Sequence, residues 1–384
     1  MARSLLSKAS HPEMLGRIGR YDVERLIGTG GMGVVFKAYD TELNRPVAVK
    51  LLAPYLASSG SARNRFAREA RAAAAVVDDH VVPIHNVETD GEHPFLVMKF
   101  IAGGSLQQRI DREGPLQVCE VLRIGMQTAQ GLAAAHAQGL IHRDVKPSNI
   151  LLDEGVDRAL LTDFGLARAS DDASLTRSGF HPGTPHYMSP EQVRGELIDA
   201  RSDLFGLGCV LYAMCTGHPP FRGESSYTVL RRITDDTPRQ IRETNPQIPA
   251  WLDRLVLKLL AKSPEDRYPS ATDVHTLLEK CLAHIQQPTT VDLPDELQQR
   301  SNLYNWFVPL GLMTVCVAIC CGIWVNTDHP EELNRNAAAQ TESASLPNDP
   351  ELQWESDTAE LESLRQDFVP VEVKTKKLWD VEPK

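Results

Sequence analysis

The sequence predicts an α+β protein with a small strand-rich lobe, a larger helical lobe and one apolar span after them. Apolar and polar residues alternate with a period of two in "VVFKAYD" and "PVAVKLL", which is typical of half-buried strands. Stripes with a period of 3.6 follow in "LQVCEVLRIGMQTAQGLAAAHAQG" and "WLDRLVLKLLAK", as in amphipathic helices. Strands first and helices later indicate two lobes joined by a hinge near residues 100–104.

Length and composition are compatible with one sizeable folded region and additional segments. The chain has 384 residues, 42% hydrophobic and 24% charged, so a core can form. Its net charge of −11 argues against general nucleic-acid binding, and we expect no nucleic-acid partner. The seven cysteines contain no Cys-x-x-Cys pair, which predicts reduced thiols rather than disulfides or a zinc site. Residues 1–20 lack the apolar stretch of a secretory signal.

The predicted organisation has five segments. They are an N-terminal extension (1–20), a globular region (21–285, with lobes at about 21–100 and 104–285), a polar juxtamembrane linker (286–302), a transmembrane helix (303–325) and an acidic tail (326–384). The tail carries 14 Asp or Glu and 6 Lys or Arg, and we expect it to be largely disordered and to lie outside the cell.

The membrane prediction depends on residues 306–325, which contain no charged side chain. A helix of this length rises about 30 Å, the thickness of a bilayer's hydrocarbon core. Trp306 and Trp324 flank it as an aromatic belt would. A buried core helix is the alternative interpretation, although such a helix normally has a polar stripe. Ala318 and Gly322 are compatible with close approach of two helices and hence with a homodimer.

A glycine-rich stretch, "LIGTGGMGVVFKAYD", has the spacing G-x-G-x-x-G. By itself the spacing is compatible with a dinucleotide site, a nucleoside triphosphate site or a plain turn. A dinucleotide fold requires a helix after the last glycine. Here β-branched and aromatic residues follow, so the stretch predicts a hairpin lid instead. We expect Gly28, Gly30 and Gly33 to let the backbone close over phosphates where a Cβ would obstruct it.

Lys50 ends the next predicted strand, "VAVK", where its ammonium group can reach phosphate oxygens. Glu69 follows on a predicted helix, and two partners are open to it. It can pair with Arg65 four residues earlier on a solvated face, or with Lys50, which it would orient toward the phosphates.

Two later motifs favour the second pairing. In "LIHRDVKPSNILL", Asp144 can accept a hydroxyl proton, Lys146 can offset charge on a moving phosphoryl group, and Asn149 can offer oxygen to Mg²⁺. In "LLTDFGLA", Asp163 supplies a second oxygen ligand. The ordered combination of glycine loop, lysine, glutamate and these two loops is highly specific.

With these motifs, residues 21–285 resemble a serine/threonine protein kinase, most closely the bacterial receptor-like kinases with a single transmembrane span. The resemblance implies the bilobal protein kinase fold and transfer of the ATP γ-phosphoryl group to Ser or Thr of protein substrates, with Mg²⁺, or alternatively Mn²⁺, as cofactor. It implies an ATP site made of Ile27, Gly28, Thr29, Gly30, Gly31, Met32, Gly33, Val34, Val35, Ala48, Lys50, Met98 (as gatekeeper) and Asp163. It implies catalytic roles for Lys50, Glu69, Asp144, Lys146, Asn149 and Thr184, with Asn149 and Asp163 as metal ligands.

The resemblance also implies supporting and regulatory residues. Asp203 would brace the catalytic loop, and Glu191 would pair with Arg267. Arg143 would pair with a phosphate on the activation loop, for which Ser174, Thr176 and Ser178 are candidate sites; an unmodified polar loop is the alternative. Lys99 stands where related kinases often carry Glu, and Phe205 where Trp is usual.

Three other functions are less compatible with these residues. A pseudokinase scaffold would lack part of the catalytic set, which is complete here. A dinucleotide oxidoreductase conflicts with the strand after Gly33, and a small-molecule phosphotransferase conflicts with "GTPHYMSPE", which resembles a peptide-docking segment. Because ATP is cytosolic, we expect the kinase region on the cytoplasmic side of the plasma (inner) membrane.

Overall fold

The computed structural model describes residues 6–9, 11–31, 33–89, 91, 93–153, 158–164 and 185–298. All of them belong to one structural unit, Met1–Ser301. The predicted span at 303–325 and the tail at 326–384 lie outside the described residues. No helix within the described ranges has both the length and the apolar character that crossing a bilayer requires.

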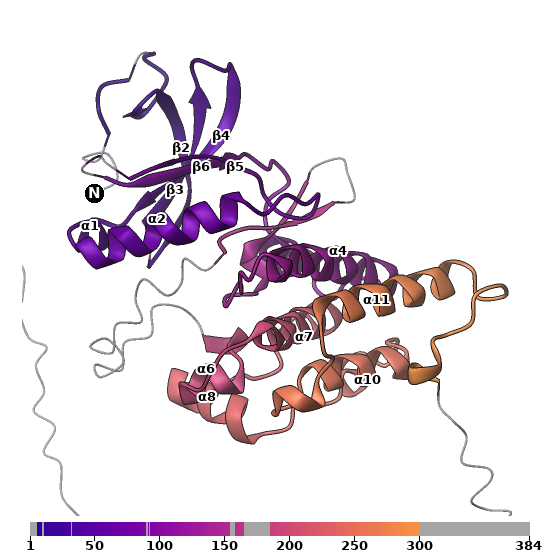
Figure 1. Ribbon diagram of the computed structural model, residues 1–384. Helices are drawn as coiled ribbons and strands as arrows, with labels where there is room; N and C mark the ends of the chain where they lie inside the picture. Colours follow the sequence, from indigo (N-terminus) through magenta and orange to yellow (C-terminus); the bar gives the residue numbers. More distant parts are fainter. Residues whose placement is uncertain are drawn as a thin grey trace, which may run out of the picture. The chain divides into compact units, whose positions relative to one another are not determined.

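The small lobe is a six-stranded antiparallel sheet with a long helix, α2, against one face (Figure 1). The strands lie in the order β1-β2-β3-β4-β6-β5. Their bounds are β1 Gly16–Ile18, β2 Tyr21–Gly30, β3 Gly33–Asp40, β4 Arg45–Leu52, β5 Ile84–Glu88 and β6 Phe95–Lys99; the helices are α1 Pro54–Ala57 and α2 Gly60–Ala74. The N-terminal extension therefore takes part in the sheet, because β1 pairs with β2 through Ile18 and Tyr21.

Alternation along β4 decides which side chains face the helix. Val47, Val49 and Leu51 pack into the core on one face of the sheet. Ala48 and Leu52 pack on the other face, against Phe66 of α2. Because successive side chains of a strand point to opposite faces, Lys50 lies on the same face as Ala48. That face is the one on which α2 and the large lobe lie.

The large lobe is helical and has its own core around α7 Ala200–Thr216, whose residues are buried on nearly every side. Helices α4, α10 and α11 pack against α7 or against one another, as Figure 1 shows. The other bounds are α3 Leu106–Glu113, α4 Val118–Ala137, η2 Pro147–Asn149, β7 Ile150–Leu152, β8 Ala159–Leu161, η4 Pro185–Tyr187, α6 Pro190–Arg194, α8 Ser226–Asp235, α9 Ile241–Thr244, α10 Ala250–Leu259, η5 Pro264–Asp266, α11 Ala271–Gln286 and η6 Asp295–Leu297.

A short connection between β6 and α3 joins the two lobes. The chain leaves β6 at Lys99 and begins α3 only at Leu106, with no helix or strand between them. Lys99 Nζ lies 3.5 Å from a carboxylate oxygen of Asp153, in the loop that follows β7. The residue that departs from the kinase pattern at the hinge is thus paired with a carboxylate of the large lobe.

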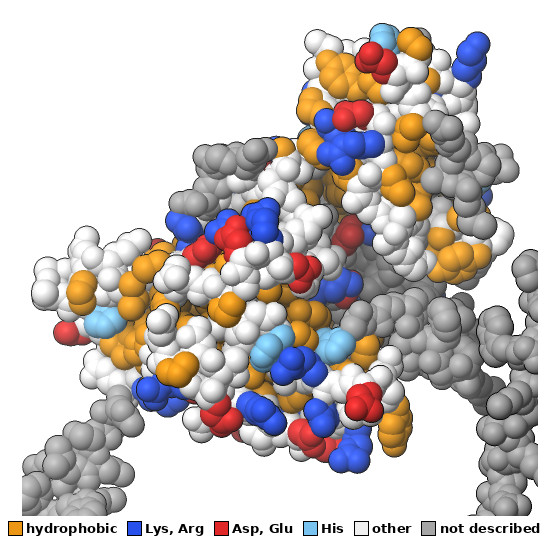
Figure 2. Space-filling model, turned by 180° about the vertical axis from the view of Figure 1, so that it is seen from behind, with side chains coloured by type: hydrophobic (Ala, Val, Ile, Leu, Met, Phe, Trp, Pro, Cys, Tyr) orange, Lys and Arg blue, Asp and Glu red, His pale blue; other side chains and the backbone are white. Residues whose placement is uncertain are grey.

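Charged side chains of both signs are scattered over the surface in Figure 2, among apolar ones. Among the described residues, exposed ion pairs include Arg20 with Glu42 at 2.6 Å and Arg112 with Glu113 at 2.8 Å. Exposed pairs of this kind contribute only about 0–1 kcal/mol each. The stability of the fold therefore depends chiefly on its buried cores and buried polar networks.

Candidate active site

The glycine-rich stretch forms the turn between β2 and β3, with Gly30 opposite Gly33 in the register. This strand–turn–strand arrangement confirms the predicted hairpin and excludes the strand–turn–helix of a dinucleotide fold. The structure gives different reasons for the presence of glycine at positions 33 and 30. Gly33 has a φ of +150°, and a Cβ there would lie 1.9 Å from the carbonyl oxygen of Leu51. A Cβ on Gly30 would meet nothing within 4 Å. Gly33 is required by the fold, whereas Gly30 borders open space.

Lys50 reaches the start of the "DFG" segment across the boundary between the lobes. Its ammonium nitrogen lies 2.8 Å from Oδ1 of Asp163, and the lysine is only 7% exposed. Glu69 of α2 is also buried, but in the described part of the chain the carboxylate that Lys50 pairs with is that of Asp163. Lys50 therefore places a buried cation, paired with one carboxylate, at the boundary between the lobes.

The loop at 142–149 is held by a carboxylate from α7. Asp203 accepts hydrogen bonds from the backbone N–H of His142 at 2.8 Å and of Arg143 at 2.7 Å, which confirms its expected bracing role. The same carboxylate lies 2.7 Å from Nε2 of His136 on α4. The His136 contact was not anticipated, because nothing in the local sequence marks this histidine among the other polar residues of its helix.

His142 connects this loop to the "DFG" segment. Its Nε2 lies 2.9 Å from the carbonyl oxygen of Thr162, and its ring packs on Phe164 with centroids 4.6 Å apart. His142 is fully buried. Asp163, which follows Thr162, has a φ of +66°, an uncommon conformation for a residue other than glycine. The histidine therefore bonds to the backbone just before Asp163 and packs on the side chain of the residue just after it.

Asp144, Lys146 and Asn149 converge as predicted. Lys146 Nζ lies 2.7 Å from Oδ2 of Asp144. The amide nitrogen of Asn149 donates to the carbonyl oxygen of Asp144 at 2.9 Å and to its Oδ2 at 3.0 Å. Because the Asn149 nitrogen is committed to Asp144, the amide oxygen is the atom left to face a cation.

The donor set fits a cation that is bound partly by phosphates. Asn149 and Asp163 offer hard oxygen atoms, and Mg²⁺ usually takes only one or two such groups from a protein. Among the described residues no cluster of three or more His, Cys, Asp or Glu suits a metal ion. Two protein ligands plus the phosphates of a nucleotide are therefore the arrangement that these residues could support.

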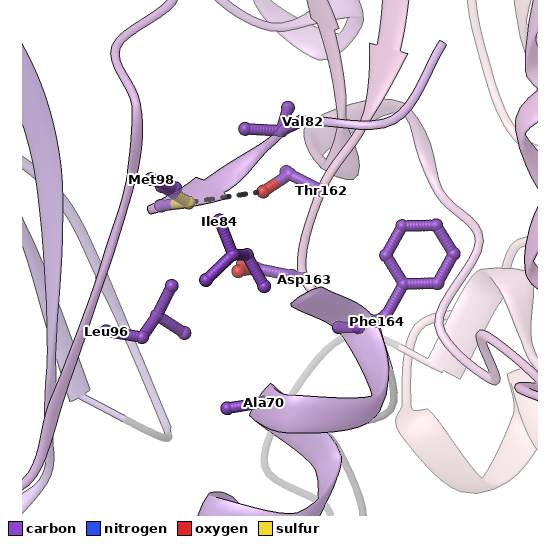
Figure 3. A pocket seen from close by; sticks show the side chains of 9 residues that line it. Ala70, Val82, Ile84, Leu96, Met98, Thr162, Asp163 and Phe164 are labelled. Atoms are coloured by element: carbon purple, nitrogen blue, oxygen red, sulfur yellow. Dashed lines mark hydrogen bonds between the residues drawn. The ribbon is translucent and has the colours of Figure 1, made fainter. Parts of the chain in front are cut away.

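A small cavity of about 20 Å³ lies behind this region, next to Met98 (Figure 3). The hydroxyl of Thr162 donates to the Met98 sulfur at 3.7 Å, so the two side chains face each other, as Figure 3 shows. Asp163 and Phe164 also line the cavity. Its volume has room for about one water molecule. Met98 thus lines this cavity and also belongs to the buried cluster that contains Ala48 and against which Val35 packs.

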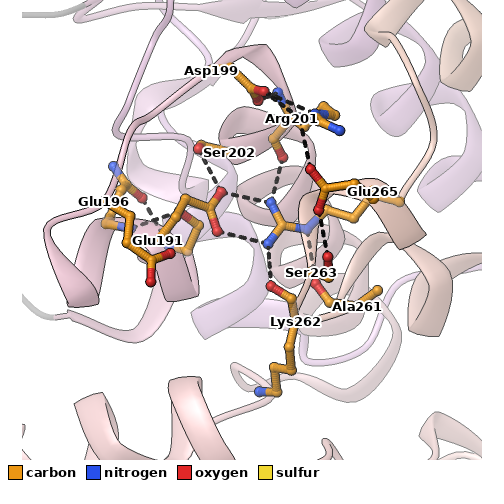
Figure 4. Close-up of polar contacts among 12 residues, drawn as sticks. Glu191, Glu196, Asp199, Arg201, Ser202, Ala261, Lys262, Ser263 and Glu265 are labelled. Atoms are coloured by element: carbon orange, nitrogen blue, oxygen red, sulfur yellow. Dashed lines mark hydrogen bonds and ion pairs between the residues drawn. The ribbon is translucent and has the colours of Figure 1, made fainter.

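A buried ion pair fixes the segment that begins with α6 (Figure 4). The Arg267 guanidinium donates to both carboxylate oxygens of Glu191, at 2.7 and 2.8 Å, which confirms the expected pair. It also donates to the carbonyl oxygens of Arg201, Ala261 and Lys262. Although burial disfavours its charge, hydrogen bonds from Arg267 and Ser202 lower the pKa of Glu191 from 4.5 to about 2.

Several predicted residues lie outside the described part. These are Met32 of the glycine-rich sequence, Thr184 of "GTPHYMSPE" and the candidate phosphorylation sites Ser174, Thr176 and Ser178. The other predicted glycine-loop positions, Ile27, Gly28, Thr29, Gly30, Gly31, Gly33, Val34 and Val35, lie on β2, β3 and the turn between them.

Comparison with known proteins agrees with this geometry. The family model "Protein kinase domain" matches residues 21–281. Serine/threonine-protein kinase PknD of Mycobacterium tuberculosis is 38% identical over 278 residues, covering 72% of this chain and 42% of PknD. PknB of Mycobacterium leprae is 39% identical over 274 residues, covering 70% of this chain and 44% of PknB.

The solved kinase domain of Mycobacterium tuberculosis PknI is 29% identical, with a TM-score of 0.56, and covers 69% of this chain and 97% of that domain. The chain thus spans less than half the length of PknD and of PknB. Because the family model covers well over half of the chain, from β2 into α11, this chain belongs to the protein kinase domain family.

Proposed function

We propose that the chain is a serine/threonine protein kinase that transfers the γ-phosphoryl group of ATP to protein hydroxyls. The observation that carries this proposal is that two groups of charged and polar residues lie on adjoining segments, since the N–H of Thr162, next to Asp163, donates to the carbonyl oxygen of Asn149 at 3.0 Å. One is the Lys50–Asp163 pair, and the other is Asp144 with Lys146 and Asn149. The similarity to PknD and PknB, which are named as serine/threonine-protein kinases, supports the same activity.

Each residue has a distinct role in the proposed reaction. A substrate hydroxyl binds to the carboxylate of Asp144, which accepts its proton as the oxygen bonds to the γ-phosphorus of ATP and the bond to ADP breaks. Lys146 offsets negative charge on the phosphoryl group, and Lys50 binds the other phosphates. Asn149 and Asp163 would hold Mg²⁺, or Mn²⁺ in its place, which neutralises phosphate charge when bound. Each of these groups is present, so a pseudokinase has no support in the described site.

The function is tested with the full chain, Mg²⁺, ATP labelled on the γ-phosphate, and peptides that contain either Ser and Thr or only Tyr. Label should enter the Ser/Thr peptides and not the Tyr peptides. Lys50→Met should abolish the transfer, because it removes the buried cation that faces the phosphates. Equal labelling by the wild type and Lys50→Met would contradict the proposed function.

Gly30→Val should raise the KM for ATP on the order of tenfold without changing the stability of the fold. The added side chain meets no protein atom within 4 Å at its Cβ, so it would project into the space that the phosphates need. Gly33→Val is the contrasting variant, since it should destabilise the hairpin through its contact with Leu51. ATP-dependent initial rates and thermal unfolding of both variants distinguish these effects, and an unchanged KM in Gly30→Val would mean that this residue only forms a turn.

We also propose that the activation loop is autophosphorylated. Arg143, next to Asp144 in the sequence, would pair with the phosphate through its guanidinium group. Ser174, Thr176 and Ser178 are the candidate residues to carry that phosphate. Mass spectrometry after incubation with ATP should find phosphate between Asp163 and Glu191. A chain that is active but carries no phosphate there would exclude this regulation.

We further propose that residues 303–325 anchor the chain in the plasma membrane, with the kinase region cytoplasmic and the tail outside. The uncharged stretch 306–325 supports this proposal, and Ala318 and Gly322 are compatible with pairing of two spans. The full chain should sediment with membranes and resist carbonate extraction, whereas a chain without residues 303–325 should not. Equal partitioning of the two chains would exclude the anchor, and cross-linking in membranes would test the homodimer.

A further inference from the structure

Arg143, the residue before Asp144, has an unfavourable backbone conformation. Its φ is +65°, in the left-handed region that residues other than glycine seldom adopt. Such a conformation persists only where the surrounding structure holds it. Its N–H donates to Oδ1 of Asp203 at 2.7 Å, and its carbonyl oxygen accepts a hydrogen bond from Nε2 of Gln192 at 2.8 Å. Two side chains from distant parts of the chain thus hold the backbone N–H and the backbone carbonyl group of Arg143.

Gln192 is well suited to hold the carbonyl because its own helix is fixed. It lies on α6, directly after Glu191, which the buried Arg267 anchors to the large lobe. Its Oε1 accepts a hydrogen bond from the backbone N–H of Ser189 at 2.8 Å, and its own N–H donates to the hydroxyl of Ser189. These bonds form the capping box of α6.

The two ends of the Gln192 amide therefore have different and complementary partners. The oxygen faces a donor, the N–H of Ser189, and the nitrogen faces an acceptor, the carbonyl of Arg143. The reverse orientation would bring two donors together at one end and two acceptors at the other, so the chemistry of the partners fixes which end is nitrogen. A glutamate could satisfy the capping box but, when ionised, could not bond to the carbonyl of Arg143.

We propose that Gln192 is a positioning residue for phosphoryl transfer. Its amide links the anchored helix α6 to the strained backbone of Arg143 and so sets the direction of the following Asp144 carboxylate. Asp203 holds the N–H side of Arg143, and Gln192 holds the carbonyl side. This role rests on the proposed kinase function and adds to it a residue outside the Asp144, Lys146 and Asn149 group.

The test compares Gln192→Glu with Gln108→Glu. Gln108 occupies the same position in the capping box of α3, where its Oε1 accepts from the N–H of Ser105 at 3.0 Å. The two variants therefore make the same chemical change in the same motif, but only one removes a donor to the catalytic loop.

With the full chain, Gln192→Glu should lower kcat about 10- to 100-fold, the range expected when a reacting group is slightly misplaced. The KM for ATP should change less than about twofold, because the nucleotide contacts are untouched. Gln108→Glu should keep wild-type kcat.

A pH series distinguishes positioning from a general loss of structure. A protonated glutamate has a carbonyl oxygen and an O–H, and so can replace both bonds of the amide. The kcat of Gln192→Glu relative to wild type should therefore recover as pH falls from 7.5 toward 5, whereas the ratio for Gln192→Met should stay constant. Thermal midpoints of Gln192→Glu and Gln108→Glu should agree within about 4 °C, the shift that the loss of one hydrogen bond would give.

If the wild type is active, equal kcat in Gln192→Glu and Gln108→Glu would overturn the positioning role. A loss of kcat in Gln192→Glu that follows a lower thermal midpoint and does not recover at low pH would overturn it as well. An inactive wild type would contradict the proposed kinase function instead.

Discussion

Replacing Asp144 by Asn should lower kcat for phosphate transfer by about 10²- to 10⁴-fold while the protein stays folded. The amide oxygen of the new side chain can still accept from Lys146 and Asn149, which lie 2.7 and 3.0 Å from Oδ2 of Asp144. What is lost is the group that accepts the hydroxyl proton. Because the ATP contacts remain, the KM for ATP should change less than about threefold. Initial rates with labelled ATP and a serine peptide measure both parameters.

Asp111→Asn is the matched control for this change. Asp111 is exposed on α3, and its carboxylate accepts a hydrogen bond from Gln107 at 2.8 Å. It should keep the rates of the wild type. If Asp144→Asn retained more than about a tenth of the wild-type kcat, Asp144 would not be the proton acceptor.

Replacing Arg267 by Met should lower the free energy of unfolding by about 3–5 kcal/mol, because it leaves a buried carboxylate without its partner. Glu191 and Arg267 are only 2% and 4% exposed. The substitution also removes donors to the carbonyl oxygens of Arg201, Ala261 and Lys262. Urea unfolding followed by circular dichroism measures the loss, and Glu191→Leu combined with Arg267→Met should recover part of it.

Arg201→Met provides the comparison at the surface. Arg201 pairs with Asp199 at 2.7 Å, but its side chain is 29% exposed and that of Asp199 is 51% exposed. Removing this pair should cost less than about 1 kcal/mol. A loss in Arg267→Met no greater than that in Arg201→Met would show that the buried pair contributes little.

The buried pair of Glu191 and Arg267 also predicts how the free energy of unfolding depends on pH. Since the pKa of Glu191 falls from 4.5 to about 2 on folding, its contribution is complete above pH 4.5 and is lost as pH falls toward 2. In Arg267→Met the carboxylate lacks its guanidinium partner and protonates more readily. The difference in unfolding free energy between wild type and Arg267→Met should therefore shrink as the pH falls from about 5 to 2. A constant difference over this range would contradict the charge-based explanation.

Local sequence patterns were sufficient to predict the strands, helices and loop that carry the candidate site. Period-two alternation predicted β3 and β4, and the 3.6-residue stripes predicted α4 and α10. The residue order of "LIHRDVKPSNILL" predicted that Asp144, Lys146 and Asn149 would converge, because a short loop leaves few other arrangements. These features depend on residues only a few positions apart, and over such short distances the spacing in the sequence determines which side chains lie together.

Contacts between segments far apart in the sequence were harder to predict. Sequence alone left Glu69 with two partners, Arg65 or Lys50, and in the described part of the chain Lys50 pairs with Asp163. The contact between His136 and Asp203 was missed because 67 residues separate them and no motif of the resemblance includes His136. The signal for Gln192 was present as Ser-x-x-Gln before α6, but a capping box marks a helix start and says nothing about a second partner.

The sequence by itself determined which chemical groups are available and the local segments that carry them: a glycine hairpin, a lysine on an alternating strand, and two loops rich in carboxylate and amide groups. Only the tertiary structure decided which carboxylate the buried Lys50 pairs with and how the strained Arg143 is held on both sides. The physical reason is that periodicity and turn chemistry act between near neighbours. Pairing of buried polar groups instead depends on where the packing of β4, α6 and α7 brings their side chains, and the need to satisfy each of them then selects the partner.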